Sequence, residues 1–250
     1  MKEQITEYIQ DLQSVNLEIT SLCNMSKEHC TQCPNAWRME NFGQTNIKTE
    51  VIERFFKELN GYGYTGLTAF HSYNEPLMDK RIYDICATHK ELCPDAKIEI
   101  LSNGRLMDND VAVRLLKLGV DQIAISAYED STYQRLVDIF APLRHEHPNC
   151  KFFVTRQILD DRMHMYGWKT RAEKGLPTIQ TCNRVKEQLV VTATGELQVC
   201  CYEWKKEMQF GNIKENTLTE ILEKSDFLSI RDDLIKGYRD NYHPCDRCTG

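Results

Sequence analysis

The sequence has no apolar run long enough for a membrane-spanning helix. No segment approaches the roughly 20 consecutive apolar residues that cross a bilayer. The opening stretch, MKEQITEYIQDLQ, is polar and acidic, and it lacks the apolar core of a signal peptide. We therefore expect a cytoplasmic protein without a membrane partner.

The sequence also lacks a basic run and a basic helix face. Its 250 residues carry a formal net charge of −6 at pH 7. Because nucleic acids are bound mainly through lysine and arginine, this balance argues against a nucleic-acid partner. The content of 41% hydrophobic and 27% charged residues is ordinary for a globular protein that buries a large core.

Cysteine, in contrast, is abundant, with eleven residues. Cytosolic thiols stay reduced, so clustered cysteines indicate metal binding before disulfides. The odd total also fits a complete disulfide framework poorly. Two sets stand out. The front set follows the apolar stretch VNLEIT, and the tail set is spread over the last third of the chain.

Strand-like segments alternate with helical segments at roughly 30 residues per unit, which is typical of repeated βα units around a parallel sheet or barrel. Polar residues follow the strand ends, where such folds carry out their chemistry, so we expect them to converge on one rim. The expected strands are 15–20, 66–73, 97–104, 121–128 and 151–158, and the expected helices are 49–63, 80–92, 108–119 and 131–144.

From about residue 165 the pattern changes. Residues 187–203 alternate around a central Thr-Gly and predict a β-hairpin, and 216–237 predict two short helices. This region is too small to bury much apolar surface, and it carries five cysteines. A small lobe held together by metal is therefore expected.

The two cysteine sets suit different roles. Four thiolates in the tail set can saturate a zinc ion or an iron–sulfur cluster. Three thiolates in the front set would leave one iron of a four-iron cluster open to another ligand. Zinc held by the pairs Cys30-x-x-Cys33 and Cys245-x-x-Cys248 is the alternative, and it leaves the other three cysteines of these sets without a role.

Together these motifs resemble a radical S-adenosylmethionine (SAM) enzyme with a C-terminal auxiliary-cluster lobe of the SPASM/twitch type. The resemblance implies an α/β fold with a partial (β/α)5–6 barrel over 1–165 and a small β-hairpin/helix twitch lobe over 166–250. It also implies two 4Fe–4S clusters. Their ligands would be Cys23, Cys30 and Cys33 for the SAM-binding cluster and Cys182, Cys200, Cys245 and Cys248 for the auxiliary cluster.

The resemblance also implies a SAM site. The segment YNEP stands where the family's Gly-Gly-Glu-Pro motif holds the methionine amino group, and LSNG and AISAYE stand where the family contacts the ribose and carboxylate. Two departures are a C-x6-C-x2-C spacing in place of C-x3-C-x2-C, and a glutamine before the last cysteine in place of an aromatic residue. The implied SAM-binding residues are Gln32, Tyr73, Asn74, Glu75, Pro76, Ser102, Asn103 and Ser126.

The short lobe is most similar to the twitch-type dehydrogenases that oxidise an alcohol of an aminocyclitol. This implies an oxidoreductase in which a 5′-deoxyadenosyl radical takes hydrogen from a small polar substrate and the auxiliary cluster accepts the second electron. An electron donor such as flavodoxin or ferredoxin is implied as a partner. Arg156, Arg171 and Glu203 are the candidates for binding substrate or assisting alcohol deprotonation.

Two alternatives stay open. A peptide-modifying enzyme or epimerase would need a thiol that returns hydrogen, for which Cys150 and Cys201 are the candidates. A degenerate or zinc-stabilised binding module is the non-enzyme alternative. Cys86 and Cys93, on or near a helix, are expected to be packing thiols.

Overall fold

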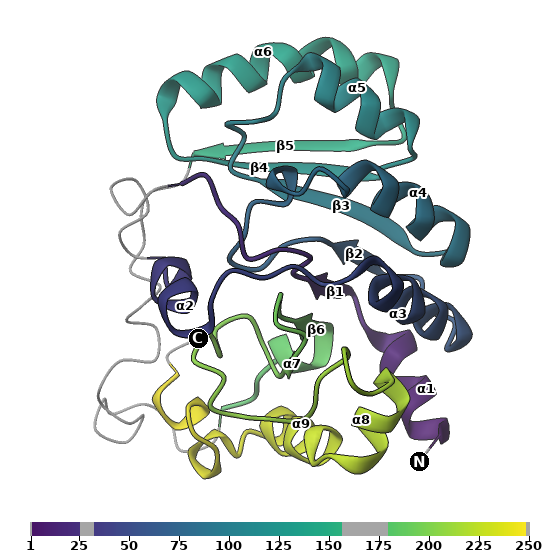
Figure 1. Cartoon of the computed structure of the whole chain (residues 1–250), viewed down its shortest axis with the longest axis vertical. Coiled ribbons are helices and arrows are strands. Elements are labelled where there is room, and N and C mark those ends of the chain that lie inside the picture. Colours follow the sequence, from purple (N-terminus) through teal and green to yellow (C-terminus); the bar gives the residue numbers. More distant parts are fainter. Residues whose placement is uncertain (1, 26–32, 157–179, 249–250) are drawn as a thin grey trace.

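The computed structural model describes residues 2–25, 33–156 and 180–248. Its centre is a curved seven-stranded sheet with the order β5-β4-β3-β2-β1-β6-β7 (Figure 1). All neighbours are parallel except β6 and β7, which form an antiparallel hairpin. The strands are β1 (Ser14–Leu17), β2 (Leu67–Ala69), β3 (Lys97–Ser102), β4 (Gln122–Ala127), β5 (Lys151–Arg156), β6 (Gln188–Val191) and β7 (Leu197–Gln198).

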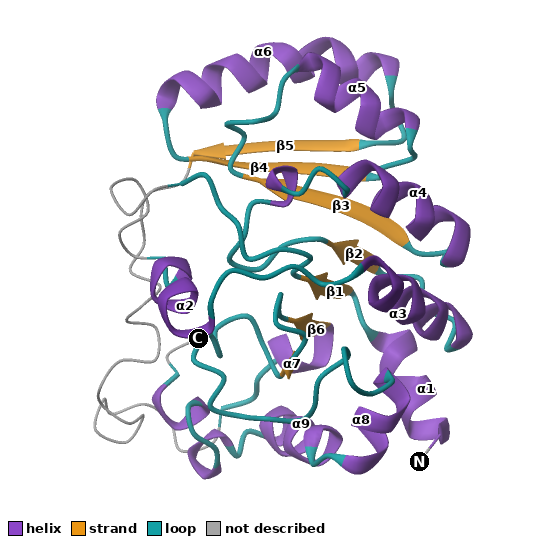
Figure 2. Cartoon of the chain, in the orientation of Figure 1, coloured by secondary structure: helices purple, strands orange, loops and turns teal. Residues whose placement is uncertain are grey.

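The helices of the βα units form one layer along the outer face of this sheet (Figure 2). The expected α/β fold with a partial, unclosed barrel is thereby confirmed. Within the described residues the helices are α1 (Lys2–Asp11), α2 (Asn35–Phe42), α3 (Thr49–Gly61), α4 (Ile82–Leu92), α5 (Asn109–Lys117), α6 (Asp130–Glu146), α7 (Arg184–Glu187), α8 (Leu218–Lys224) and α9 (Phe227–Lys236).

Local sequence signals explain why the predicted helices form. In α3 the apolar residues Val51, Phe55 and Leu59 recur at helical spacing and are all buried. At the start of α5 the Asp108 carboxylate accepts a hydrogen bond of 2.8 Å from the backbone N–H of Val111. Beyond its end, Gly119 adopts φ +77°, a conformation that favours glycine.

Helix α1 and helix α2 were not predicted. Helix α1 is polar in composition, yet Ile5, Tyr8 and Ile9 form a buried stripe at helical spacing. Helix α2 follows the front cysteines, and its buried residues are the polar Asn35 and Arg38. A search for apolar periodicity therefore misses it.

Strand β6 belongs to the main sheet although it lies in the C-terminal part of the sequence. It pairs in parallel with β1, from Ser14 opposite Gln188 to Leu17 opposite Val191. This pairing satisfies the backbone groups on the second edge of β1, which is buried. The predicted hairpin is confirmed. The predicted boundary between 165 and 166 lies outside the described residues and stays a prediction.

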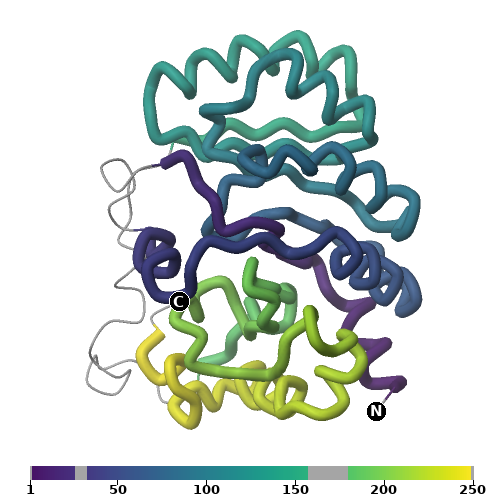
Figure 3. The backbone as a smooth tube through the Cα atoms, viewed as in Figure 1, coloured from purple at the N-terminus to yellow at the C-terminus, as the bar shows by residue number. Residues whose placement is uncertain are grey.

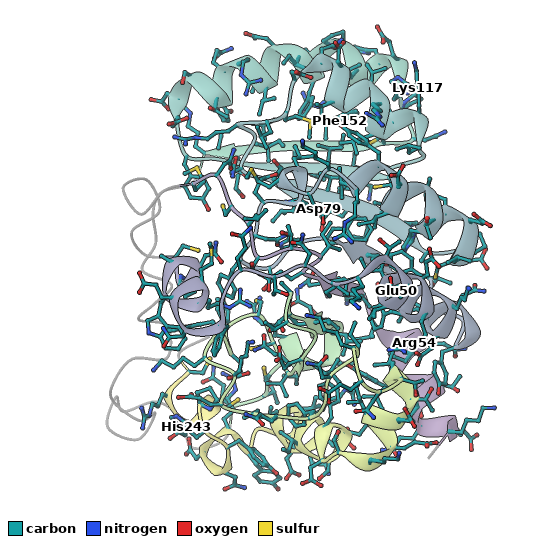
Figure 4. The ribbon with its side chains drawn as sticks, viewed as in Figure 1. Glu50, Arg54, Asp79, Lys117, Phe152 and His243 are labelled. Carbon is teal, nitrogen blue, oxygen red and sulfur yellow. The ribbon has the colours of Figure 1, made fainter. Side chains whose placement is uncertain are left out.

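The remainder of the C-terminal region, residues 192–248, packs against the N-terminal part of the chain (Figure 3). Arg54 of α3, labelled in Figure 4, donates hydrogen bonds to the carbonyl oxygens of Ile213 and Asn216. The Tyr62 hydroxyl lies 2.7 Å from the Thr219 hydroxyl. These contacts hold the region against α3. No helix of the described residues is both long and apolar enough to cross a bilayer.

The strands alternate between apolar and polar side chains. Val15, Leu17, Ile98 and Ile100 are buried against the outer helices, as are Ile123 and Ile125. The residues between them are more polar and face the inside of the curve. The hydrophobic core therefore lies between sheet and helices, and a polar interior is left inside the sheet.

His89 of α4 is a buried titratable group in this core. Its Nε2 lies 2.9 Å from the Thr68 hydroxyl, and its ring packs edge-on against Phe56 with a centroid distance of 4.8 Å. Burial, with a smaller effect of Lys90, lowers the pKa of His89 to about 4. Since an unfolded histidine has a pKa near 6.5, the unfolded chain binds a proton that the folded chain excludes.

We expect the free energy of unfolding to fall as the pH decreases from about 6.5 towards 4, because protonation favours the unfolded state in this window. The contribution of His89 is about 3 kcal/mol when the window has been crossed. Urea unfolding at several pH values should show a weaker pH dependence for His89→Gln than for the wild type. Parallel pH profiles of the two proteins would contradict the assignment.

Candidate cofactor and substrate site

A cavity of about 850 Å³ lies inside the curve of the sheet. Its walls include residues that follow the carboxyl ends of β1 to β4, so the expected convergence of these ends on one rim is confirmed. Four residues of the C-terminal region also line it: Arg184, Gln188, Cys201 and Tyr202. One compartment therefore adjoins both the barrel rim and the segment that carries the tail cysteines.

Glu75 is a buried acid of the rim, with 1% of its surface exposed. Its carboxylate accepts hydrogen bonds from the Ser102 hydroxyl and the Asn103 N–H, both at 2.8 Å, and from the Leu77 N–H at 3.2 Å. Burial raises the pKa of Glu75 despite these bonds. No cationic side chain of the described residues pairs with it, so the carboxylate is available to a ligand ammonium group.

The turn after β3 holds Glu75 from one side and the front cysteine loop from the other. Gly104 has φ +79°, and a Cβ there would lie 2.5 Å from the Leu136 side chain, so only glycine fits. The Asn103 amide donates to Asn24 Oδ1 at 2.7 Å and lies 4.0 Å from Cys23 Sγ. Asn103 thus links the acid that faces the cavity to the first cysteine.

Tyr73 and Asn74 precede Glu75 in the YNEP segment, for which the family resemblance predicts SAM contacts. The Asn74 side chain turns back to its own loop, where it accepts from the Ser72 N–H and donates to the Phe70 carbonyl. The Tyr73 hydroxyl donates to the backbone carbonyl of Cys201. Tyr73 therefore connects the rim to the C-terminal region. Pro76 is buried and begins the short 3₁₀ helix Pro76–Met78.

A buried ion pair lies behind Tyr73. Glu18 and Arg38 form a bidentate pair with both N–O distances at 2.8 Å, and the Glu18 carboxylate also accepts from the backbone N–H groups of Tyr73 and Ala193. Burial alone would raise the pKa of Glu18, but Arg38 and the hydrogen bonds lower it. Sequence reasoning missed this pair. Its one local signal is an acid inside the apolar stretch VNLEIT.

Two of the three front cysteines lie in the described residues, and both line the cavity. Burial, with smaller effects of Glu75 and Cys33, raises the pKa of Cys23 to about 11. A thiol in such a place ionises when it binds a metal or an iron–sulfur cluster. Cys30 and Gln32 lie outside the described residues.

The four tail cysteines lie close enough for their charges to interact. Burial raises the pKa of Cys245, and Cys200, Cys248 and Cys182 raise it further, in that order of effect. The nearby Arg239 opposes them, and its Nη1 lies 4.0 Å from Cys248 Sγ. The arrangement places a buried positive charge beside four potential thiolates.

This donor set fits an iron–sulfur cluster. Over the ranges that the structure describes, no three His, Cys, Asp or Glu side chains are grouped as for a single metal ion. In a four-iron cluster each thiolate binds a different iron, so its sulfurs lie farther apart than around one zinc ion. Four soft donors beside a guanidinium suit such an anionic centre.

The remaining predicted residues are distributed unevenly. Ser126 of β4 lines the cavity. Arg156 has a side chain that is 60% exposed and pairs with Asp130 at 3.3 Å. Glu203 is buried outside the cavity lining, and burial raises its pKa to about 8. Arg171 lies outside the described residues. The catalytic roles of these residues stay predictions.

The positions of the other four thiols show which of them reach the cavity. Cys86 and Cys93 are fully buried in the core, as expected of packing thiols. Cys150 is buried just before β5, at the end of the sheet opposite to the rim. Cys201 lines the cavity, with its Sγ 3.7 Å from Arg184 Nη1. Of the two candidate hydrogen donors, Cys201 is the one that reaches the site.

Two protein families match the chain. The radical SAM superfamily matches residues 17–138, and the SPASM iron–sulfur cluster-binding domain matches residues 182–249. The chain carries a radical SAM domain followed by a SPASM domain. Its first domain binds SAM and a 4Fe–4S cluster, and its SPASM domain binds an auxiliary iron–sulfur cluster. The front cysteines lie within the first matched range, and the tail cysteines lie within the second.

This radical SAM enzyme resembles a SAM-dependent 2-deoxy-scyllo-inosamine dehydrogenase of Niallia circulans. The two are 22% identical over 238 residues, which is 94% of this chain and 92% of the relative. The crystal structure of BtrN in complex with AdoMet and 2-DOIA has a TM-score of 0.73 at 22% identity and covers 96% of this chain and 93% of BtrN.

A second solved structure shares the fold at a greater distance. Native anSMEcpe with bound AdoMet and Cp18Cys peptide has a TM-score of 0.57 at 14% identity, and the match covers 95% of this chain and 86% of that one. The fold of this radical SAM enzyme is therefore shared with proteins whose named ligands are a small molecule and a peptide.

We expect Glu75→Gln to weaken SAM binding about tenfold or more, because the buried carboxylate that faces the ligand ammonium is lost. Equilibrium dialysis of anaerobically reconstituted protein measures the effect without turnover. Glu91→Gln, the same change at an exposed position of α4, should leave the affinity unchanged. Equal SAM affinities of Glu75→Gln and wild type would exclude this role.

We expect Arg38→Met to lower the free energy of unfolding by about 3–5 kcal/mol, because Glu18 would remain charged and buried without its partner. Denaturant unfolding measures this change. Lys48→Met breaks the exposed pair with Glu50 and should cost less than about 1 kcal/mol. Similar losses in the two variants would show that the buried pair has no special weight.

Proposed function

We propose that this enzyme oxidises an alcohol of a small polar substrate, with an aminocyclitol or a sugar alcohol as the substrate class. The observation that supports this most strongly is that one cavity is lined by Cys23 and Cys33 on the barrel side and by Cys201 beside the tail set. A substrate held there lies between two cluster sites. The near full-length likeness to a named aminocyclitol dehydrogenase agrees with it.

Oxidation of a secondary alcohol to a ketone removes one hydrogen atom, one electron and one proton. When bound, SAM and its cluster supply the radical that takes the hydrogen atom, and the auxiliary cluster takes the electron. The chain supplies Glu75 for the ammonium group of SAM and a cavity that is large enough for a small substrate beside it. Arg156, Arg171 and Glu203 are the proposed candidates for the proton.

The charge distribution of the C-terminal region supports an electron-accepting role. The guanidinium of Arg239 is buried and donates to the Thr181 carbonyl at 2.6 Å, which fixes it beside Cys248. A fixed positive charge next to an anionic cluster favours the reduced form of that cluster. We propose a flavodoxin or ferredoxin as the external reductant and the cytoplasm as the location.

A second candidate function is radical modification or epimerisation of a peptide. It is supported by Cys201, whose thiol lines the cavity and would return a hydrogen atom to a substrate radical. The fold shared with a peptide-bound structure agrees with this candidate but does not favour it over oxidation. Cys201→Ala separates the two, because it should abolish epimerisation and leave alcohol oxidation in place.

The first experiment is to count iron, sulfide and zinc per chain after anaerobic reconstitution of wild type and Cys245→Ala. We expect about eight irons in the wild type and about four in the variant, because the variant loses the auxiliary cluster. SAM-dependent ketone formation from aminocyclitols and sugar alcohols is then tested on the wild type. About four irons in both proteins would remove the electron acceptor, and zinc without iron would exclude the proposed chemistry.

A further inference from the structure

Glu99 of β3 is a second acid that faces the cavity. Its side chain points inside the curve of the sheet, between outward-facing Ile98 and Ile100. The carboxylate accepts a hydrogen bond from the amide of Gln122 on the neighbouring strand. Burial raises the pKa of Glu99, and the bond to Gln122 opposes this effect. No cationic side chain of the described residues pairs with Glu99.

The groups that share this part of the cavity are polar and neutral. Asn16 and Ser14 of β1 and Gln188 of β6 line it, and Gln188 Oε1 is buried without a hydrogen-bond partner among the described residues. The inner end of the cavity therefore holds one anionic group and several hydrogen-bonding groups. Such a set is complementary to a small cation that also carries hydroxyls.

Arg184 also lines the cavity, and its guanidinium contacts residues of the C-terminal region. Its Nη1 lies 3.7 Å from Cys201 Sγ, its Nη2 lies 3.4 Å from the Tyr202 hydroxyl, and its guanidinium stacks on the Tyr202 ring at 4.4 Å. Burial by itself would lower the pKa of Arg184, but Cys201 and Tyr202 raise it overall. Arg184 therefore interacts with Cys201 and Tyr202 of the C-terminal region, and Glu99 remains available to a ligand.

Glu99 and Glu75 mark two separate anionic points in one cavity. Glu75 is bonded to Ser102, and Glu99 precedes Ser102 by three residues on β3, roughly 10 Å along the strand. The two acids are therefore too far apart to share one ammonium group. With Glu75 assigned to the ammonium of SAM in the proposed function, Glu99 is available to a second cation.

We propose that Glu99 binds the ammonium group of an amine-bearing substrate and thereby selects aminocyclitols over cyclitols that carry hydroxyls only. This inference rests on the proposed function, because it places the substrate in the same cavity. A neutral analogue would leave the carboxylate buried without a counter-charge. We expect a preference of about 10- to 100-fold for the amine.

The test measures binding to the reconstituted, SAM-bound and unreduced holoenzyme, so that no turnover is needed. Calorimetry compares 2-deoxy-scyllo-inosamine with the cyclitol in which a hydroxyl replaces its amine. Ligand-observed NMR compares cyclohexylamine with cyclohexanol as a pair without other hydroxyls. The proteins are the wild type, Glu99→Gln, Glu99→Asp and the exposed control Glu91→Gln.

We expect the wild type and Glu91→Gln to prefer the amine of each pair, Glu99→Asp to retain part of the preference, and Glu99→Gln to lose it. SAM affinity and melting temperature should be equal in Glu99→Gln and wild type, which shows that the substrate site alone has changed. An amine preference that persists in Glu99→Gln, or no preference in the wild type, would overturn the inference.

The two proposals fail in different ways. Suppose that the wild type binds neither cyclitol but binds cyclohexylamine more tightly than cyclohexanol, and that Glu99→Gln loses this difference. The ammonium site would then be supported, and the cyclitol substrate class would be wrong. If the wild type binds and oxidises both cyclitols equally well, the proposed oxidation stands and the role of Glu99 is wrong.

Discussion

The buried pair of Glu18 and Arg38 joins the parts of the molecule that have to meet at the site. Glu18 directly follows the end of β1, and Arg38 belongs to α2. The Glu18 carboxylate also accepts hydrogen bonds from backbone N–H groups in the segment after β2 and in the β6–β7 turn. A buried carboxylate is tolerated only when its charge and lone pairs are satisfied. The Glu18 carboxylate keeps its counter-charge and its hydrogen bonds only when these four segments are placed as they are here.

This constraint reaches the front cysteine loop. Helix α2 begins two residues after Cys33, so the pair positions the end of that loop relative to β1. On the other side of α2, the Trp37 ring packs edge-on against Trp204 at a centroid distance of 5.1 Å. Helix α2, which follows Cys33, is thus held between the barrel and the C-terminal region.

The two acids that face the cavity differ from the charged residues packed around it. The walls use their charges in pairs, such as Glu18 with Arg38, or place a guanidinium beside thiols, as Arg239 and Arg184 do. Within the part of the chain that the structure describes, Glu75 and Glu99 face the cavity and accept hydrogen bonds from neutral groups only. Because burying an unmatched carboxylate is costly, these two positions are where ligand cations contribute most to binding.

The sequence by itself determined the order of strands and helices, the two cysteine sets and the acid of the YNEP segment. These features are local: periodicity reports which face of an element is buried, and a motif needs only neighbouring residues. Helix α2 escaped because its buried face is polar, and α1 because its apolar stripe is short.

The tertiary structure alone decided which distant segments became neighbours. No pattern within 188–191 states that this strand pairs with β1, and nothing near Arg38 identifies Glu18 as its partner. The inward direction of Glu99, and the absence of a cationic partner for it among the described residues, likewise depend on strand register and on the side chains that reach the cavity. Periodicity specifies a buried face without naming what covers it, and pairing across the chain is settled only when backbone hydrogen bonds, volume and charge are satisfied together.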